Sequence, residues 1–140
     1  MNIGIIGHGY VGESQSFAFS SSFNVKVYDK DSLKSTHSID EVLESDFIFV
    51  CLPTPMRKDG SQDISLISDF FKNANEGPIY IIKSTIVPGT TNSLNKKYEN
   101  LDIIFSPEFL TERTAKLDIL TQTRIILGGY ESLTNKVKKI

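Results

Sequence analysis

The sequence predicts an α/β fold with a doubly wound, mainly parallel sheet and helices on both faces. Short apolar runs alternate with helix-compatible segments along the chain. The first apolar run leads directly into Gly7-His8-Gly9-Tyr10-Val11-Gly12, and the second ends in Asp29, about 20 residues after that turn. This succession of strand, glycine turn, helix, strand and acid is typical of a Rossmann-type domain.

The elements of the first half follow one another without a repeat or a linker. Strands are expected over residues 3–6, 24–29 and 47–52, and helices over 13–22, 38–43 and 64–73. The run Phe47–Leu52 is apolar throughout, as in a strand that is buried on both faces. Ser38, followed three residues later by Glu41, has the pattern of a capped helix.

In the second half, Gly77-Pro78 breaks the preceding helix and starts the next group of elements. Strands are expected over residues 79–83, 102–105 and 123–127, and helices over 90–98 and 133–140. Right-handed crossovers would bring the carboxyl ends of the strands to one edge of the sheet, where ligands bind in such folds.

Length and composition are those of one globular domain, 1–140, and exclude several classes of partner. The net charge of −2 offers no basic surface for nucleic acid or for an acidic membrane. No apolar stretch approaches the roughly 20 residues that span a bilayer, and no signal peptide is expected. The single cysteine, Cys51, is compatible with a reducing cytoplasm, and no metal site is predicted.

The glycine string predicts a site for the diphosphate of a dinucleotide. Gly7 allows the tight turn, Gly9 lets the backbone approach the diphosphate, and Gly12 lets the helix pack against the strand. The helix that begins near Tyr10 and Val11 points free N–H groups and the positive end of its dipole at the phosphates.

Asp29 predicts the choice of cofactor. Its carboxylate would accept hydrogen bonds from the ribose hydroxyls of adenosine and would repel a 2′-phosphate, so NAD is favoured over NADP. Lys30 would soften that preference. The alternative is a glycine-rich turn that binds nothing, with Asp29 as a solvated strand end.

Four further strand ends are informative in this order and spacing: Cys51–Pro55, Lys83–Thr90, Ser106–Arg113 and Arg124–Gly129. Together with the glycine turn, they resemble the N-terminal, NAD-binding domain of the UDP-glucose/GDP-mannose dehydrogenase family. The resemblance covers essentially the whole chain. It implies oxidation of the primary alcohol of a nucleotide sugar to a carboxylate by two NAD. UDP-glucose is the expected substrate, and GDP-mannose stays open. A β-hydroxyacid dehydrogenase shares the glycine turn but lacks the Pro-Glu-Phe-Leu segment.

The resemblance also implies roles for single residues. Pro53 and Thr54 would line the cofactor site, and Thr85 would position the reacting groups and a catalytic water near the nicotinamide. Phe109 and Leu110 would hold the sugar nucleotide through main-chain contacts. Without the resemblance, Pro53 and Thr54 are only a strand terminator, and Thr85 is a helix cap.

Glu108 and Glu112 are four positions apart and would share one face of a helix. Two carboxylates that close raise the pKa of one of them, which then serves as an acid or base near neutrality. The resemblance gives Glu108 a place near the substrate and Glu112 a role in proton transfer and thioester hydrolysis. In the alternative, this is a solvated helix face on which Glu112 pairs with Lys116. Lys83 is either structural or directed into the site.

The pattern is incomplete, because the family's second half carries a nucleophilic cysteine that these 140 residues do not contain. Cys51 lies in an apolar run, where a thiol is expected to be buried and inert, and His8 and His37 are expected to be solvated. We therefore expect NAD binding without turnover. The chain is either a part of a dehydrogenase or a non-catalytic nucleotide-binding module. The apolar residues of the last expected helix, residues 133–140, would favour association of copies.

Overall fold

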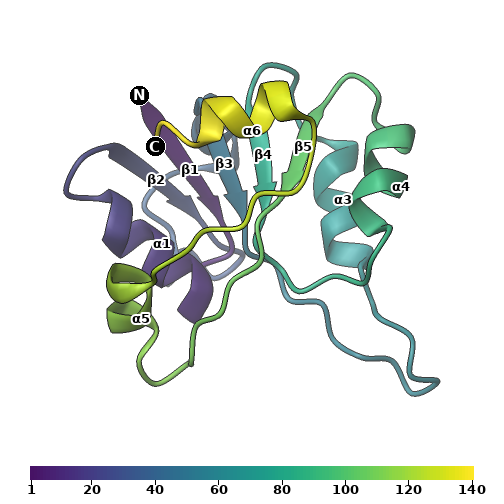
Figure 1. Ribbon diagram of the computed structural model, residues 1–140, viewed down its shortest axis with the longest axis horizontal. Helices are drawn as coiled ribbons and strands as arrows, with labels where there is room; N and C mark the ends of the chain where they lie inside the picture. Colours follow the sequence, from purple (N-terminus) through teal and green to yellow (C-terminus); the bar gives the residue numbers. More distant parts are fainter.

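The computed structural model describes residues 1–140 and contains one five-stranded, wholly parallel sheet in the order β2-β1-β3-β4-β5 (Figure 1). The strands are β1 (Asn2–Ile6), β2 (Asn24–Tyr28), β3 (Phe47–Val50), β4 (Ile79–Ile82) and β5 (Asp102–Phe105). The helices are α1 (Tyr10–Phe19), α2 (Ile39–Leu43), α3 (Ser65–Lys72), α4 (Thr90–Lys97), α5 (Ala115–Thr121) and α6 (Glu131–Val137), with a short 3-10 turn, η1, at Ser32–Lys34. The predicted fold class is confirmed.

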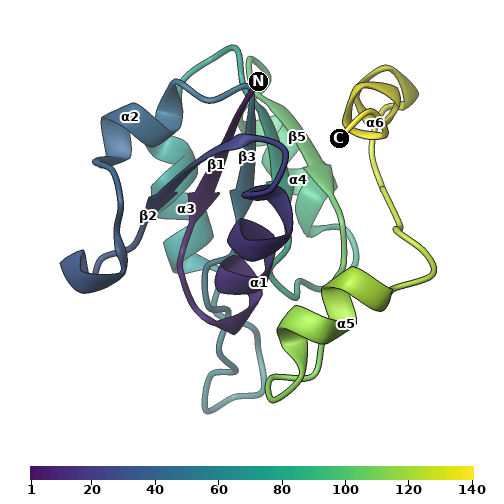
Figure 2. The same cartoon turned by 90° about the vertical axis from the view of Figure 1, so that its left-hand side faces the viewer.

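The two faces of the sheet carry separate hydrophobic cores, because alternate residues of each strand point to opposite faces. Ile3 and Ile5 belong to the core that α1 and α6 cover, whereas Ile6 belongs to the core that α2, α3 and α4 cover. Figure 2 shows α2 and α3 on one side of the sheet and α1, α5 and α6 on the other. A sheet covered on both faces leaves its strand ends as the accessible edges.

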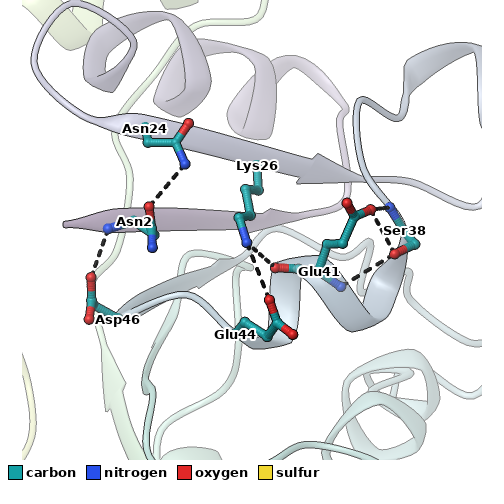
Figure 3. A network of polar contacts seen from close by, with 7 residues as sticks. All are labelled: Asn2, Asn24, Lys26, Ser38, Glu41, Glu44 and Asp46. Atoms are coloured by element: carbon teal, nitrogen blue, oxygen red, sulfur yellow. Dashed lines mark hydrogen bonds and ion pairs between the residues drawn. The ribbon is translucent and has the colours of Figure 1, made fainter.

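Polar side chains join the amino ends of three strands, at the end of the sheet where the strands begin. The backbone N–H of Asn2 donates to the Asp46 carboxylate at 2.7 Å, and the Asn24 amide donates to Asn2 Oδ1 at 2.9 Å (Figure 3). These bonds hold β1, β2 and the start of β3 in register.

Helix α2 begins with the predicted capping box. The Ser38 hydroxyl accepts from the backbone N–H of Glu41, whose carboxylate accepts from the backbone N–H of Ser38 at 2.8 Å. Lys26 of β2 donates to the Glu41 carbonyl at 2.8 Å and lies 3.7 Å from Glu44, as Figure 3 shows. Helix α2 is thus attached to the edge strand.

The expectation of a sixth strand over residues 123–127 was wrong. Only Gly128 pairs with β5, in one antiparallel bridge that exchanges two hydrogen bonds with Phe105 at 2.7 and 2.8 Å. Ile125 and Ile126 are 68% and 44% exposed. An apolar run forms a strand only where a neighbour supplies a ladder of N–H and C=O groups, and here the backbone pairs with β5 at one residue.

The last two helices also differ from expectation. Helix α5 was not predicted as an element; it packs on α1, where Lys116 lies 2.7 Å from Glu13. Helix α6 covers Glu131–Val137 instead of residues 133–140, and its Leu133 and Val137 are buried against the sheet rather than presented for association. No helix has the length and apolar character needed to cross a membrane.

Candidate functional site

A cavity of about 790 Å³ opens at the carboxyl ends of the strands, which is the volume range of small-molecule and cofactor sites. The predicted site residues that line it are Gly7, Gly9, Tyr10, Val11, Asp29, Lys30, Pro53, Thr54, Thr85 and Glu108. Four others do not line it: Gly12, Phe109, Leu110 and Glu112. The cavity therefore joins the glycine turn to the ends of all five strands.

The glycine turn has the geometry that the sequence predicts. Gly7 has a φ of +88°, and a Cβ on it would lie 2.7 Å from the Cys51 carbonyl oxygen. A Cβ on Gly12 would overlap the carbonyl oxygen of Gly7, so Gly12 sets how closely α1 approaches β1. A Cβ on Gly9 would meet nothing within 4 Å, because Gly9 faces the open cavity. A diphosphate could therefore approach the backbone at Gly9.

Helix α1 starts at this turn with Gly9 as its N-cap, and no side chain caps it. The N–H groups of a helix's first turn have no partner within the helix, and they carry the positive end of its dipole. Tyr10 and Val11 of that turn line the cavity. The arrangement fits an anion.

Asp29 follows β2 and braces the turn through backbone hydrogen bonds. Its Oδ2 accepts from the N–H of His8 at 2.6 Å, and its Oδ1 accepts from the N–H of Asp31 at 2.9 Å. Burial opposes ionisation, but these two bonds and the charge of Lys34 outweigh it and lower the pKa of Asp29. The carboxylate is therefore charged at neutral pH and lies at the cavity wall.

The Asp29 end of the cavity includes residues that the sequence did not single out. Lys34 and Asp40 line the cavity as Lys30 does, and the charge of Lys34 acts on Asp29. Helices α2 and α3 supply apolar lining residues of the cavity: Ile39 and Leu43 from α2, and Leu66 and Phe70 from α3. Only the position of Lys34 and Asp40 shortly after the acid-bearing strand could have indicated them.

The opposite end of the cavity is formed by the loops that leave β3 and β4. Thr54 and Thr85 both line it, and the Thr54 hydroxyl donates to the Thr85 carbonyl at 2.6 Å. The same carbonyl accepts from the Gln62 side-chain amide at 2.8 Å. These bonds tie two strand-end loops together.

Lys83 is both structural and directed at the cavity, so the two readings left open by the sequence both hold. Its Nζ donates to Ser106 Oγ and to the Pro107 carbonyl, each at 3.3 Å, and only 7% of the residue is exposed. Burial lowers the pKa of Lys83, and the charge of Glu108 opposes that shift. The lysine thus anchors the loop that carries Glu108 from the end of β5.

The spacing of Glu108 and Glu112 suggested a shared helix face, and this expectation was wrong. The chain is irregular from 106 to 111 and turns at 112–114. Glu108 instead accepts a 2.6 Å bond from the backbone N–H of Leu110. The alternative pairing was also wrong, since Lys116 pairs with Glu13. Both carboxylates still act on one group: burial and the charges of Glu108 and Glu112 raise the pKa of Tyr10.

Phe109 lies outside the cavity. It is 60% exposed, and the Arg124 guanidinium lies 5.6 Å from its ring centroid. Leu110 is half-buried, and its N–H is engaged by Glu108. Neither residue takes part in the cavity of this chain.

The predictions for Cys51 and His8 have different outcomes. Burial raises the pKa of the Cys51 thiol to about 12, as expected of an unreactive thiol, although the residue is only half-buried and lines the cavity. His8 was expected to be solvated, but its Nε2 atom is buried and has no hydrogen-bond partner. The glycine turn folds this ring inward.

Comparison with known proteins identifies the family. Residues 23–140 match the NAD binding domain of the UDP-glucose/GDP-mannose dehydrogenase family. The UDP-glucose 6-dehydrogenase AglM of Haloferax volcanii is 33% identical over 78% of this chain and 30% of that protein. The UDP-glucose 6-dehydrogenase of Campylobacter jejuni is 29% identical over 95% of this chain and 43% of its own length.

Solved structures agree on the fold. A UDP-D-ManNAc dehydrogenase from Pyrococcus horikoshii has a TM-score of 0.85 at 23% identity, over 99% of this chain and 44% of that one. A GDP-mannose dehydrogenase from Pseudomonas aeruginosa has a TM-score of 0.82 at 22% identity, over 99% of this chain and 43% of that one. This chain spans less than half the length of these relatives. The chain belongs to the UDP-glucose/GDP-mannose dehydrogenase family and represents its NAD binding domain.

Proposed function

We propose that this chain is the NAD-binding half of a nucleotide-sugar 6-dehydrogenase. The whole enzyme would oxidise UDP-glucose to UDP-glucuronate, with reduction of two NAD. The observation that carries the proposal is one cavity with the glycine turn and Asp29 at one end, and Thr85 and Glu108 at the other. A relative named UDP-glucose 6-dehydrogenase, 33% identical over most of the chain, supports the choice of sugar nucleotide, and GDP-mannose is the second candidate.

In this proposal, the first end of the cavity holds the adenosine diphosphate part of NAD. Gly9 admits the diphosphate, and the free N–H groups at Tyr10 and Val11 bind its charge. The ionised Asp29 accepts from the ribose hydroxyls, and Lys30 lies beside it. A 2′-phosphate would be repelled by Asp29, so NADP binds more weakly.

The second end holds the reacting groups. NAD, when bound, supplies the hydride acceptor. Pro53 and Thr54 line its site, and Thr85 positions the sugar C6 and the attacking water. Glu108 lies at the end of β5, where it contacts the substrate. Glu112 assists proton transfer from the rim, where its charge already acts on Tyr10.

The rest of the chemistry belongs to a second half of the enzyme, beyond domain 1–140. This chain contributes Phe109 and Leu110, which hold the sugar nucleotide through the main chain. A cysteine of the second half carries the acyl intermediate. We assign no such role to Cys51, because burial raises the pKa of its thiol to about 12 and so disfavours the thiolate.

We also place the protein in the cytoplasm and infer that copies of it associate. Its one cysteine is free, as in a reducing compartment. Leu117 and Leu120 of α5 are each 61% exposed, and Ile125 in the segment after α5 is 68% exposed. Sedimentation velocity at micromolar protein checks the association: a dimer supports it, and a monomer at all concentrations contradicts it.

Calorimetric titration of the chain with NAD and with NADP tests the cofactor assignment. We expect saturable binding of NAD, and NADP binding at least about tenfold weaker, which corresponds to about 1.4 kcal/mol. Preference for NADP, or heat from neither, would contradict the assignment. The chain alone should form no NADH with UDP-glucose, and steady NADH formation would contradict the division of labour between the two halves.

A further inference from the structure

Gln62 makes a two-point contact with the backbone of the loop after β4. Its Nε2 donates to the Thr85 carbonyl at 2.8 Å, and its Oε1 accepts from the N–H of Val87 at 3.0 Å. One side-chain amide thus holds both sides of Ile86. The side-chain amide supplies the donor through its NH₂ group and the acceptor through its oxygen.

The Thr85 carbonyl accepts a second bond, from the Thr54 hydroxyl at 2.6 Å. Thr54 and Gln62 both belong to the loop between β3 and α3. Thr54 and Thr85 line the cavity, whereas Gln62 does not. Because Gln62 does not line the cavity, we expect it to affect a molecule bound there through the position of Thr85.

The loop that carries Gln62 is itself braced. It projects at the lower right of Figure 1, between β3 and α3. Met56 and Gln62 form an antiparallel bridge, and Arg57 lies 3.1 Å from Asp63. The N–H of Asp63 donates to the Pro55 carbonyl at 2.8 Å, and its carboxylate accepts from the N–H of Ser65 at 2.9 Å. These contacts fix Gln62 before any ligand arrives.

Apart from Gln62, the loop after β4 is held by the Thr54 bond, by a 3.2 Å bond from the N–H of Thr90 to the Val87 carbonyl, and by Ile86, which packs against the core. Residues 85–87 form no helix or strand, and both Thr85 and Val87 are exposed. An exposed segment outside regular secondary structure loses conformational entropy when a ligand orders it, and a side-chain contact that orders it in advance lowers that cost.

We infer that Gln62 is a positioning residue that sets the place of Thr85 and so strengthens binding of the nicotinamide-bearing half of the cofactor. The inference rests on the proposed function, which puts the adenosine diphosphate at Asp29 and the nicotinamide at Thr85. Its specific consequence is that loss of the clamp weakens binding of NAD but not of ADP-ribose, which lacks the nicotinamide.

The test compares the full chain with Gln62→Ala and Gln62→Glu in titrations with NAD and with ADP-ribose. Loss of one or two neutral hydrogen bonds predicts a Kd for NAD that is about threefold to tenfold higher, with the Kd for ADP-ribose unchanged within about twofold. Gln62→Glu keeps the acceptor for Val87 but places an oxygen against the Thr85 carbonyl, so it should weaken NAD binding as much. Ser61→Ala is the control, because the Ser61 hydroxyl bonds only Asp59.

Hydrogen exchange of the Val87 amide reads the clamp directly, without any ligand. Exchange should become faster in Gln62→Ala and stay slow in Gln62→Glu. Equal weakening of both ligands, or of neither, would overturn the inference, as would unchanged exchange in Gln62→Ala. If the unsubstituted chain bound neither ligand, the proposed function would fail, while the exchange rates would still decide whether Gln62 orders the loop.

Discussion

The carboxylate of Asp29 accepts a 2.6 Å hydrogen bond from the backbone N–H of His8, 21 residues earlier in the chain. This bond attaches the end of β2 to the glycine turn. Asp29 thus has two tasks that the motif alone does not separate: it shapes the turn, and it presents a negative charge to the cavity.

Asp29→Asn should weaken NAD binding by about tenfold to a hundredfold, because hydrogen bonds to charged groups contribute about 1.5–3 kcal/mol. Calorimetric titration measures the change. Asp59→Asn is the matched control, since the Asp59 carboxylate bonds only Ser61, far along the loop after β3. An unchanged Kd in Asp29→Asn would contradict the assignment of Asp29 to the ribose.

Alanine at two glycines of the turn should affect different properties: Gly12→Ala should lower stability, and Gly9→Ala should weaken NAD binding. In Gly12→Ala, the new Cβ overlaps the Gly7 carbonyl oxygen, so we expect a loss of about 3 kcal/mol or more in the free energy of unfolding. In Gly9→Ala, the Cβ enters open space, and the loss should stay below about 1 kcal/mol.

Binding separates the same pair. Gly9→Ala places its methyl group where the diphosphate would lie, so NAD binding should fall at least about tenfold in a folded protein. Urea unfolding and titration of both variants check this. A well-folded Gly9→Ala that binds NAD normally would show that the diphosphate lies elsewhere.

Lys83→Met should remove a gain in stability at alkaline pH. Because burial lowers the pKa of Lys83 in the folded chain, the unfolded chain holds this proton to higher pH, up to about 10.4. The free energy of unfolding therefore increases as the pH rises through the pKa that Lys83 has in the folded chain. Below that pKa, the cost of burying the charged ammonium is present in full.

Urea unfolding at pH 7.5 and 9.5 checks this expectation for Lys83. The stability of the unsubstituted chain relative to Lys83→Met should increase with pH, and the exposed Lys58→Met should show no such trend. A relative stability that falls with pH would mean that Lys83 gains a charge partner in the fold.

Cys51 should react very slowly with a thiol reagent in the native chain. With a pKa of about 12, only about one thiol in ten thousand is ionised at pH 8, compared with roughly a quarter in an unfolded chain. The rate of reaction with a disulfide reagent, followed by absorbance, should be more than about a hundredfold lower in buffer than in urea. Comparable rates would show an accessible thiolate.

The five strands of the sheet could be predicted because each is a short apolar run that ends in a glycine, a proline or a polar residue. The turn at Gly7 and the cap at Ser38 could also be predicted, since both are local chemistry. The run at Ile125 and Ile126 is equally apolar, yet it forms no strand. Its neighbour β5 offers a partner only to Gly128, and a run of residues cannot show whether an edge is available.

The amino-acid sequence by itself determined the layered α/β architecture, the glycine turn and the acid after β2, because periodicity, turns and caps depend on residues close together in the chain. Only the tertiary structure decided which groups meet at the strand ends. Gln62 reaches Thr85 across 23 residues, Lys83 reaches Pro107 across 24, and Glu108 and Glu112 part because no helix forms between them. Such contacts follow from the order in which strands stack in the sheet, and that order brings together loops whose separation in sequence carries no signal.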